Sequence, residues 1–137
     1  MKRFDLTKKR GSKFSIIGAT RSAQAAIMTL PPGGTSDDAL SNEHPRCEQW
    51  CFIVSGTGKI LTAKTGTRQR TMRLRAKMLV AIERGERHQI VNDSDQPLTT
   101  WNLYVPPAYD SHANPKPTAK RKLKYEANHF KSKRSRV

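Results

Sequence analysis

Two stretches of the sequence decide the expected fold: residues 42–56, which read NEHPRCEQWCFIVSG, and residues 82–92, which read IERGERHQIVN. Each stretch places a histidine just ahead of an apolar run and close to turn residues. Because strand side chains alternate between two faces, strands from different parts of one barrel can direct His44 and His88 to a common point. We therefore expect the two histidines to share a pocket.

Short apolar runs recur around these stretches at a spacing of roughly ten residues, and turn signals separate them. Strands are expected at 14–19, 25–30, 49–55, 59–63, 69–74, 78–82, 89–92 and 97–105. Many short strands with regular turns and no strong helical period favour an all-β barrel or sandwich.

The 137 residues carry a formal net charge of +15, and basic residues gather at both ends of the chain. Residues 116–137 include nine Lys or Arg, one acidic residue and few apolar side chains. Such a segment does not bury enough apolar surface to offset the entropy lost on ordering. We therefore expect a basic N-terminal segment at 1–13, one β-barrel at 14–112, and a basic tail at 113–137 that is partly disordered or forms a short helix.

The sequence contains no apolar run near the ~18 residues that a membrane span needs. The basic N-terminal segment also lacks the apolar centre of a secretory signal. On an extended strand, Cys47 and Cys51 lie ~13 Å apart, too far for a disulfide, so Cys51 is expected to be a small buried hydrophobe. A cytoplasmic location with reduced thiols follows from these features.

The second histidine stretch resembles a motif of the cupin family, G-x5-P-x-G-x2-H-x3-N. Gly85, His88 and Asn92 match this motif at the family spacing. Lys77 stands where the family has its first glycine, and Glu83 stands where it has proline.

The first histidine stretch resembles the other cupin motif, G-x5-H-x-H-x3,4-E-x6-G. His44 takes the place of the second histidine and Gly56 that of the closing glycine. Asn42 occupies the first histidine position, and Gln49 occupies the glutamate position. Two spaced motifs therefore agree with the same family.

One cupin branch, the mannose-6-phosphate isomerase-like proteins, is more similar. Its fragments E-x-H-P-x-x-D-Q and Y-x-P-P resemble residues 42–49 and 104–107. The resemblance covers residues 24–110 and leaves the basic tail outside. It implies a cupin double-stranded β-helix, or jelly-roll, barrel with a site in its mouth that in this family usually holds a divalent metal ion.

The resemblance implies that His44, Gln49 and His88 bind this metal, with Asn42 in the fourth place. Imidazole nitrogen and amide oxygen suit zinc, nickel, iron or manganese. All four ligands are neutral, so we expect the ion to be weakly bound or absent. Strand alternation directs Glu43 and Glu48 away from this site unless the loop bends.

Alternation also predicts which residues line the pocket. If Gln49 points inward, the residues two and four positions later do so too, while Trp50 and Phe52 point outward. The expected lining residues are Cys51, Ile53, Ile90 and Tyr104. Trp50 and Phe52 on an outer face need cover, which predicts a homodimer.

Three functions are open at this point. The first is a binding module that holds a sugar or a small carboxylic acid or phosphate, favoured by the neutral ligand set and the lack of an evident general base. The second is a metal-dependent enzyme, similar to a sugar-phosphate isomerase or a dioxygenase. The third is salt-dependent nucleic-acid association through the basic tail.

Overall fold

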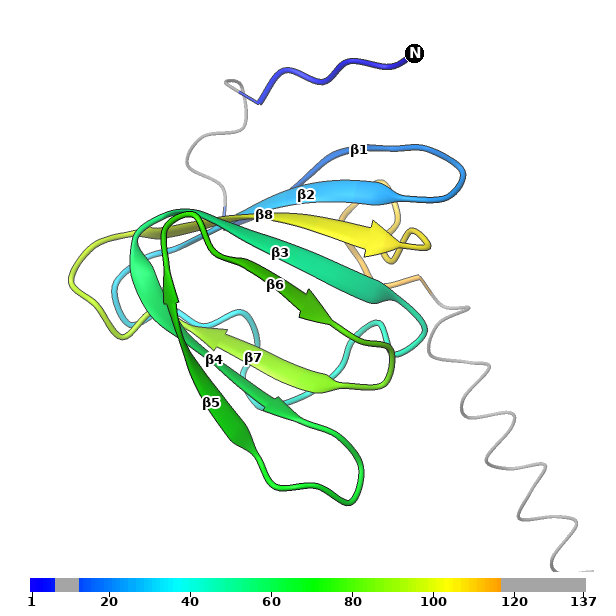
Figure 1. Cartoon of the computed structure of the whole chain (residues 1–137). Coiled ribbons are helices and arrows are strands. Elements are labelled where there is room, and N and C mark those ends of the chain that lie inside the picture. The colour runs from blue at the N-terminus through cyan, green and yellow to red at the C-terminus, as the bar shows by residue number, and fades with distance from the viewer. Residues whose placement is uncertain (7–12, 117–137) are drawn as a thin grey trace, which may run out of the picture.

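The computed structural model describes residues 1–6 and 13–116, which form a barrel of two antiparallel sheets (Figure 1). One sheet has five strands in the order β1-β2-β8-β3-β6, and the other has three in the order β5-β4-β7. The strands are β1 (Phe14–Ala19), β2 (Gln24–Leu30), β3 (Glu48–Ser55), β4 (Thr57–Ala63), β5 (Arg70–Arg75), β6 (Leu79–Ile82), β7 (Arg87–Val91) and β8 (Leu98–Val105). The expected all-β barrel is confirmed.

All eight expected strands form, and none of their ends moves by more than two residues. In β3, Gln49, Cys51 and Ile53 are buried, whereas Trp50 is exposed and Phe52 is half-buried. These are the inward and outward faces that the period of two predicts, because adjacent strand side chains point to opposite faces.

One part of the barrel interior is filled by aliphatic side chains from both sheets, which we call the aliphatic core. Its members are Met28, Leu30, Cys51, Ile53, Ile60, Leu74, Ile82, Ile90 and Leu98. Gly56 passes the chain from β3 of one sheet into β4 of the other with a φ of +87°. A Cβ there would lie 2.2 Å from the oxygen of Pro97, so only glycine fits this crossing.

Asn92, which follows β7, is fully buried and organises the neighbouring turns. Its Nδ2 donates to the main-chain oxygens of Leu30 at 2.9 Å and Gln96 at 2.7 Å. Its Oδ1 accepts from the main-chain N–H of Ser94 at 3.0 Å. This motif asparagine therefore joins the end of β2 to the β7–β8 turn and does not border the pocket.

The segment after β8 folds back against the start of β2. The side-chain Nε2 of Gln24 donates to the main-chain oxygen of Tyr109 at 2.9 Å. Its Oε1 accepts from the main-chain N–H groups of Ala108 at 3.1 Å and Tyr109 at 2.9 Å. The ring of Tyr109 consequently packs against Phe14, with centroids 4.9 Å apart.

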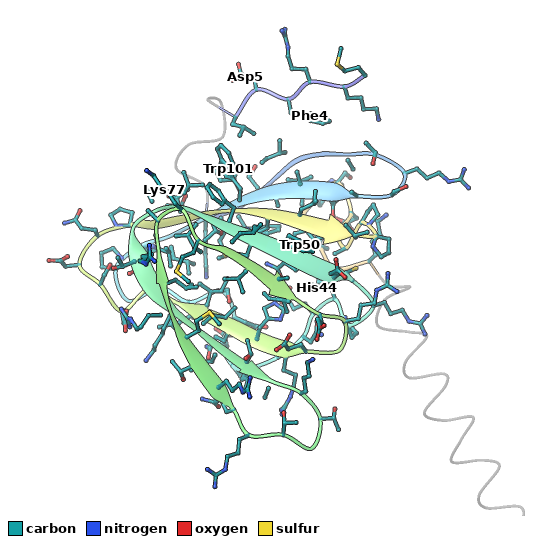
Figure 2. All side chains as sticks on the ribbon, in the orientation of Figure 1. Phe4, Asp5, His44, Trp50, Lys77 and Trp101 are labelled. Carbon is teal, nitrogen blue, oxygen red and sulfur yellow. The ribbon has the colours of Figure 1, made fainter. Side chains whose placement is uncertain are left out.

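The outer face of the five-stranded sheet is apolar. Trp50, Leu79, Trp101 and Leu103 are between 39 % and 58 % exposed. Residues 1–6 lie over this face, and Figure 2 shows Phe4 and Trp101 on the same side of the barrel. A hollow of about 510 Å³ separates the two, and no charged side chain lines it.

The cysteines are both buried, and their thiols are free, as expected. The described residues include no helix that is long and apolar enough to cross a membrane. The basic tail from 117 onward, for which partial disorder or a short helix was predicted, lies outside the described residues.

Candidate functional site

His44 lies in the loop that leads into β3, and a short turn holds it in place. The main-chain N–H of His44 donates to Asn42 Oδ1 at 3.0 Å. Asn42 Nδ2 donates to the main-chain oxygen of Glu86 at 3.2 Å, which ties the loop to the β6–β7 turn. Both polar atoms of the Asn42 side chain therefore bond to main chain, and this residue does not border the cavity described below.

His88 points inward from β7. Its main-chain N–H donates to the oxygen of Ser41 at 2.9 Å, which attaches the same loop to β7. Its Nδ1 lies 3.1 Å from the main-chain oxygen of Glu86. Because a carbonyl oxygen only accepts, Nδ1 carries the proton of the neutral ring and Nε2 keeps its lone pair.

The imidazole rings of His44 and His88 are neighbours, with centroids 5.1 Å apart. Burial, and then the nearby His88, lower the pKa of His44 from 6.5 to about 4. Burial also lowers the pKa of His88. Both rings are therefore neutral at neutral pH, which is the form that binds metals and exchanges hydrogen bonds with uncharged ligands.

Gln49 is buried on β3 beside His44, and its orientation is fixed from behind. Its Nε2 donates to Asn102 Oδ1 at 2.9 Å, and Asn102 donates to Thr100 Oγ1 at 2.9 Å. Gln49 Oε1 is thereby left as an acceptor. Within the described residues, this oxygen and His44 Nδ1 are buried without a hydrogen bond of normal geometry. Gln49 is nevertheless close enough to His44 to raise its pKa, which partly opposes the larger lowering by burial.

These side chains border a cavity of about 220 Å³ between the two sheets. The cavity is lined by Lys13, Phe14, Met28, Ser36, Asp37, Ser41, Glu43, His44, Gln49, His88, Ile90, Tyr104, Tyr109 and Ala113. Ile90 and Tyr104, which were expected in the lining, border it. Cys51 and Ile53 belong instead to the aliphatic core beneath.

Tyr104 and Tyr109 form an aromatic wall beside His44. The ring centroid of His44 lies 4.9 Å from that of Tyr104 and 6.0 Å from that of Tyr109, both in edge contacts. Burial raises the pKa of both phenols, so their hydroxyls stay protonated. Sequence reasoning missed Tyr109, because it belongs to no strand and Gln24 on β2 fixes its position.

Glu43 also borders the cavity, which strand alternation did not predict. The hydroxyl of Tyr109 donates to Glu43 Oε2 at 3.5 Å. Asp37, from the same loop, is a second carboxylate in the wall and accepts from the main-chain N–H of Asp38 at 2.8 Å. The loop bends between Asn42 and β3, and a loop imposes no period of two on its side chains.

A family model described as a cupin domain matches residues 26–105, well over half of the chain. The chain belongs to the cupin family. The resemblance seen in the two histidine stretches is confirmed at this level.

Solved structures are similar to this cupin over most of its length. The Bacillus halodurans protein BH2720 is 17 % identical, with 80 % of each chain covered and a TM-score of 0.67. A Klebsiella pneumoniae protein with a double-stranded β-helix domain is 18 % identical, over 77 % of this chain and 90 % of its own, with a TM-score of 0.63. An RmlC-like cupin from Methanocaldococcus jannaschii is 17 % identical, over 77 % and 91 %, with a TM-score of 0.60. At these identities the likeness shows the fold alone, and no curated protein matches the chain significantly.

The pocket of this cupin differs in charge from the chain as a whole. The chain is strongly basic, but the cavity wall has two carboxylates, Asp37 and Glu43, one cation, Lys13, and two neutral histidines. An anion placed beside the histidines would meet these carboxylates without a compensating imidazolium. The wall is therefore better suited to a neutral or positively charged occupant.

Donors for a metal ion are present in limited number. Among residues 1–6 and 13–116, no three His, Cys, Asp or Glu side chains converge as a metal site would need. A divalent ion at His44 and His88 would therefore take its third ligand from the amide oxygen of Gln49. Its positive charge would meet only neutral ligands.

Proposed function

We propose that this cupin binds a small, uncharged, hydroxyl-bearing ligand, a sugar, in the pocket between its two sheets. The observation that carries the proposal is the pair of buried polar atoms, His44 Nδ1 and Gln49 Oε1, neither of which makes a hydrogen bond of normal geometry with the described residues. Each such atom costs about 1–3 kcal/mol if it stays unsatisfied. A hydroxyl group both donates and accepts, so sugar hydroxyls can satisfy both atoms.

The shape and composition of the pocket agree with this ligand class. A volume of about 220 Å³ holds a small molecule and lies below that of sites for drug-sized ligands. Phe14, Tyr104 and Tyr109 supply aromatic surface for the carbon-bound hydrogens of a sugar ring. Asp37 and Glu43 accept from hydroxyls but repel carboxylates and phosphates, which disfavours the acidic ligands considered from the sequence.

The pKa values of the side chains in the pocket also favour binding without turnover over acid–base catalysis. The pKa values of the two histidines are lowered and those of the two tyrosines are raised. General acid–base groups work best with a pKa near the operating pH. Chemistry of the isomerase or dioxygenase type, which the branch resemblance implies, would therefore need a group other than these four.

Thermal shift with a defined ligand panel tests the proposal. Glucose, mannose and galactose form one arm, and acetate, malonate and inorganic phosphate form the other. At least one sugar should raise the melting temperature in a dose-dependent way. The shift should disappear in His44→Ala and persist in His112→Ala, which changes an exposed histidine outside the cavity. Stabilisation by the anions alone would contradict the proposal.

A divalent metal ion held by His44, His88 and Gln49 is the second candidate occupant. The observation in its favour is the Nδ1 contact of His88 with the Glu86 carbonyl, since this arrangement aims the other ring nitrogen of many metal-binding histidines. When bound, such an ion would act as a Lewis acid on an oxygen of the ligand. The neutral ligand set makes weak binding the expected result.

Elemental analysis of protein purified without an affinity tag or chelator decides this point. One zinc, nickel, iron or manganese per chain, lost in the His44→Ala/His88→Ala double variant, would establish the metal site. If neither protein holds metal and added ZnCl₂ or NiCl₂ leaves the melting temperature unchanged, the metal candidate is overturned and the sugar proposal is left to its own test.

We also propose that a second copy of the chain covers the apolar outer face of the five-stranded sheet. Residues 1–6 reach over this face through Phe4 but leave the hollow beside Trp50 and Trp101. No charge lines the hollow, and a second copy presents the same uncharged surface across a twofold axis. Size-exclusion chromatography with light scattering should show a dimer. Trp101→Glu should dissociate it, whereas Met72→Glu, on an exposed position of the other sheet, should not.

A further inference from the structure

The β4–β5 hairpin and the turn that follows it have an extreme charge composition. Residues 49–82 contain no Asp or Glu. The cations of this stretch are Lys59, Lys64, Arg68, Arg70, Arg73, Arg75 and Lys77. β5 is the free edge of the three-stranded sheet, and Figure 1 shows the hairpin projecting from the barrel.

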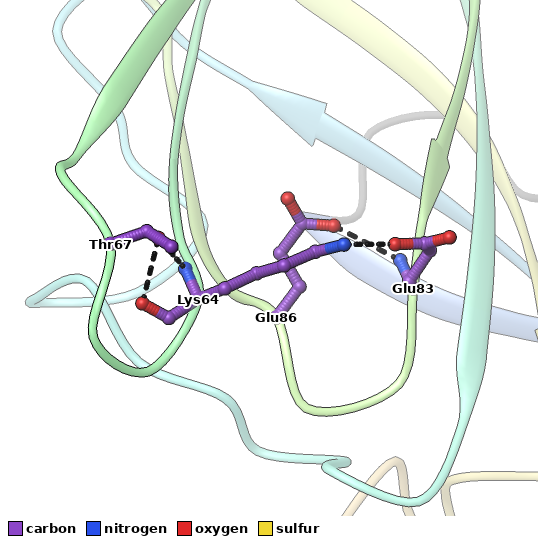
Figure 3. A network of polar contacts seen from close by, with 4 residues as sticks. All are labelled: Lys64, Thr67, Glu83 and Glu86. Atoms are coloured by element: carbon purple, nitrogen blue, oxygen red, sulfur yellow. Dashed lines mark hydrogen bonds and ion pairs between the residues drawn. The ribbon is translucent and has the colours of Figure 1, made fainter.

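Most of these cations face solvent without an acidic partner. All of β5 except Leu74 is exposed. Among the described residues, the structure pairs only two of the seven with a carboxylate. Lys64 pairs with Glu83 of the β6–β7 turn (Figure 3). Arg73 pairs with Asp93, with Nη2 to Oδ1 at 3.1 Å.

The strand register places like charges directly opposite each other. Lys59 of β4 is the cross-strand partner of Arg73 of β5, and the carboxylate of Asp93, whose pKa Arg73 and then Lys59 lower, compensates this one pair. Arg68, Arg70 and Arg75 have no such carboxylate among the described ion pairs. Charged side chains on an edge strand discourage aggregation, but either sign serves that purpose, and mixed signs avoid the repulsion. The single sign of the exposed charges that have no ion pair therefore points to an anionic partner.

We propose that the β4–β5 hairpin binds the phosphate backbone of duplex nucleic acid without sequence preference. Arginine is the dominant cation of β5, and its planar fork matches phosphate oxygens. A two-stranded β-ribbon fits the major groove of a duplex. Residues 57–77 contain no Phe, Tyr or Trp on which unpaired bases could stack, which disfavours a single strand.

Fluorescence anisotropy with a labelled 20-base-pair DNA duplex, over a series of NaCl concentrations, tests this surface in the full chain. The informative variant is Arg68→Gln/Arg70→Gln/Arg75→Gln, which spares the ion-paired Arg73. Its affinity should fall at least about tenfold at low salt, and the slope of log K against log salt should become shallower by about 2 to 3.

Two matched variants show whether duplex binding depends on the charge of the hairpin or on the net charge of the chain. Arg3→Gln/Arg21→Gln/Arg84→Gln removes the same charge from exposed positions elsewhere and should keep nearly the full slope. Arg68→Lys/Arg70→Lys/Arg75→Lys keeps the charge and should keep the slope as well. Circular dichroism establishes that each variant folds.

Several results would overturn the proposal. These are no duplex binding by the wild-type chain, equal losses in the hairpin and control variants, or full binding in the hairpin variant. The last result would assign binding to other basic residues, including those of the tail. Tighter binding of a 20-nucleotide poly-dT strand than of the duplex would also overturn it.

Discussion

The interior of the barrel has two regions built from the same kind of strand position but with opposite chemistry. In the aliphatic core, inward side chains such as Ile53 and Leu30 pack on one another and are completely buried. In the pocket, Gln49 and His88 occupy equivalent inward positions, and they border an open volume with His44. Along β3, the change from one chemistry to the other takes two residues, from Gln49 to Cys51.

This difference shows which region stabilises the barrel and which region lowers its stability. Close-packed aliphatic residues contribute by burial and by the absence of voids. Buried polar atoms without partners subtract from stability. The pocket is thus expected to reduce stability in a barrel that its core holds together, as is common at binding sites.

The largest effect is expected from damage to the aliphatic core. Ile53→Ala should lower the free energy of unfolding by about 2–5 kcal/mol, because it removes buried methylene groups and leaves a cavity. Ile53→Val is the matched control and should cost about 0.5–1.5 kcal/mol. Urea denaturation followed by circular dichroism measures both. Equal, small losses in the two variants would contradict the close packing of this region.

A smaller effect is expected from acidification, and it acts on the pocket. The pKa of His44 is 6.5 in the unfolded chain and about 4 in the folded chain. Between these values the unfolded state binds more protons, so the free energy of unfolding falls as the pH falls from 6.5 towards 4, by up to about 3 kcal/mol. The lowered pKa of His88 acts in the same direction.

Urea denaturation at a series of pH values between 7.5 and 4.5 measures this loss, and His44→Leu isolates the contribution of one ring. The variant should lose distinctly less stability on acidification than the wild type. The same pH dependence in both proteins would show that His44 is protonated as readily in the folded chain as in the unfolded one.

The smallest effect on stability is expected from the same His44→Leu substitution at neutral pH. It removes a buried nitrogen that has no hydrogen bond of normal geometry and keeps an apolar volume next to Tyr104. The free energy of unfolding should therefore change by no more than about 1 kcal/mol, or rise. Sugar-induced stabilisation should nevertheless be lost. A large destabilisation would mean that His44 holds the barrel together, and the contrast between the two regions would fail.

Much of this fold could be predicted from the sequence because residues that alternate between the two faces of a strand produce a sequence pattern with a period of two. Once Gln49 is taken to point inward, as the resemblance implies, the burial of Cys51 and Ile53 and the exposure of Trp50 follow from alternation. The closeness of His44 to His88 was also expected, from two spaced motifs on different strands.

Loop positions could not be predicted in this way. Glu43 and Asp37 reach the cavity from a loop whose path depends on hydrogen bonds to the β6–β7 turn and to β7. Tyr109 depends on Gln24, which is far away in the sequence. The sequence therefore predicted the neutral side chains His44, Gln49 and His88 of the pocket wall but not its carboxylates, and this omission made an acidic ligand look suitable.

The bond between Gln24 and the segment after β8 sets a limit on shortening this protein. The family match ends at residue 105, but the hydrogen bonds that the described structure gives the side chain of Gln24 all go to main-chain groups of Ala108 and Tyr109. A truncation at 105 would leave a buried amide unpaired at the start of β2 and remove a wall of the cavity. The smallest unit that both folds and retains its pocket thus extends past the residues that the family model matches. A shortened version of this protein should therefore keep Gln24 and Tyr109 together.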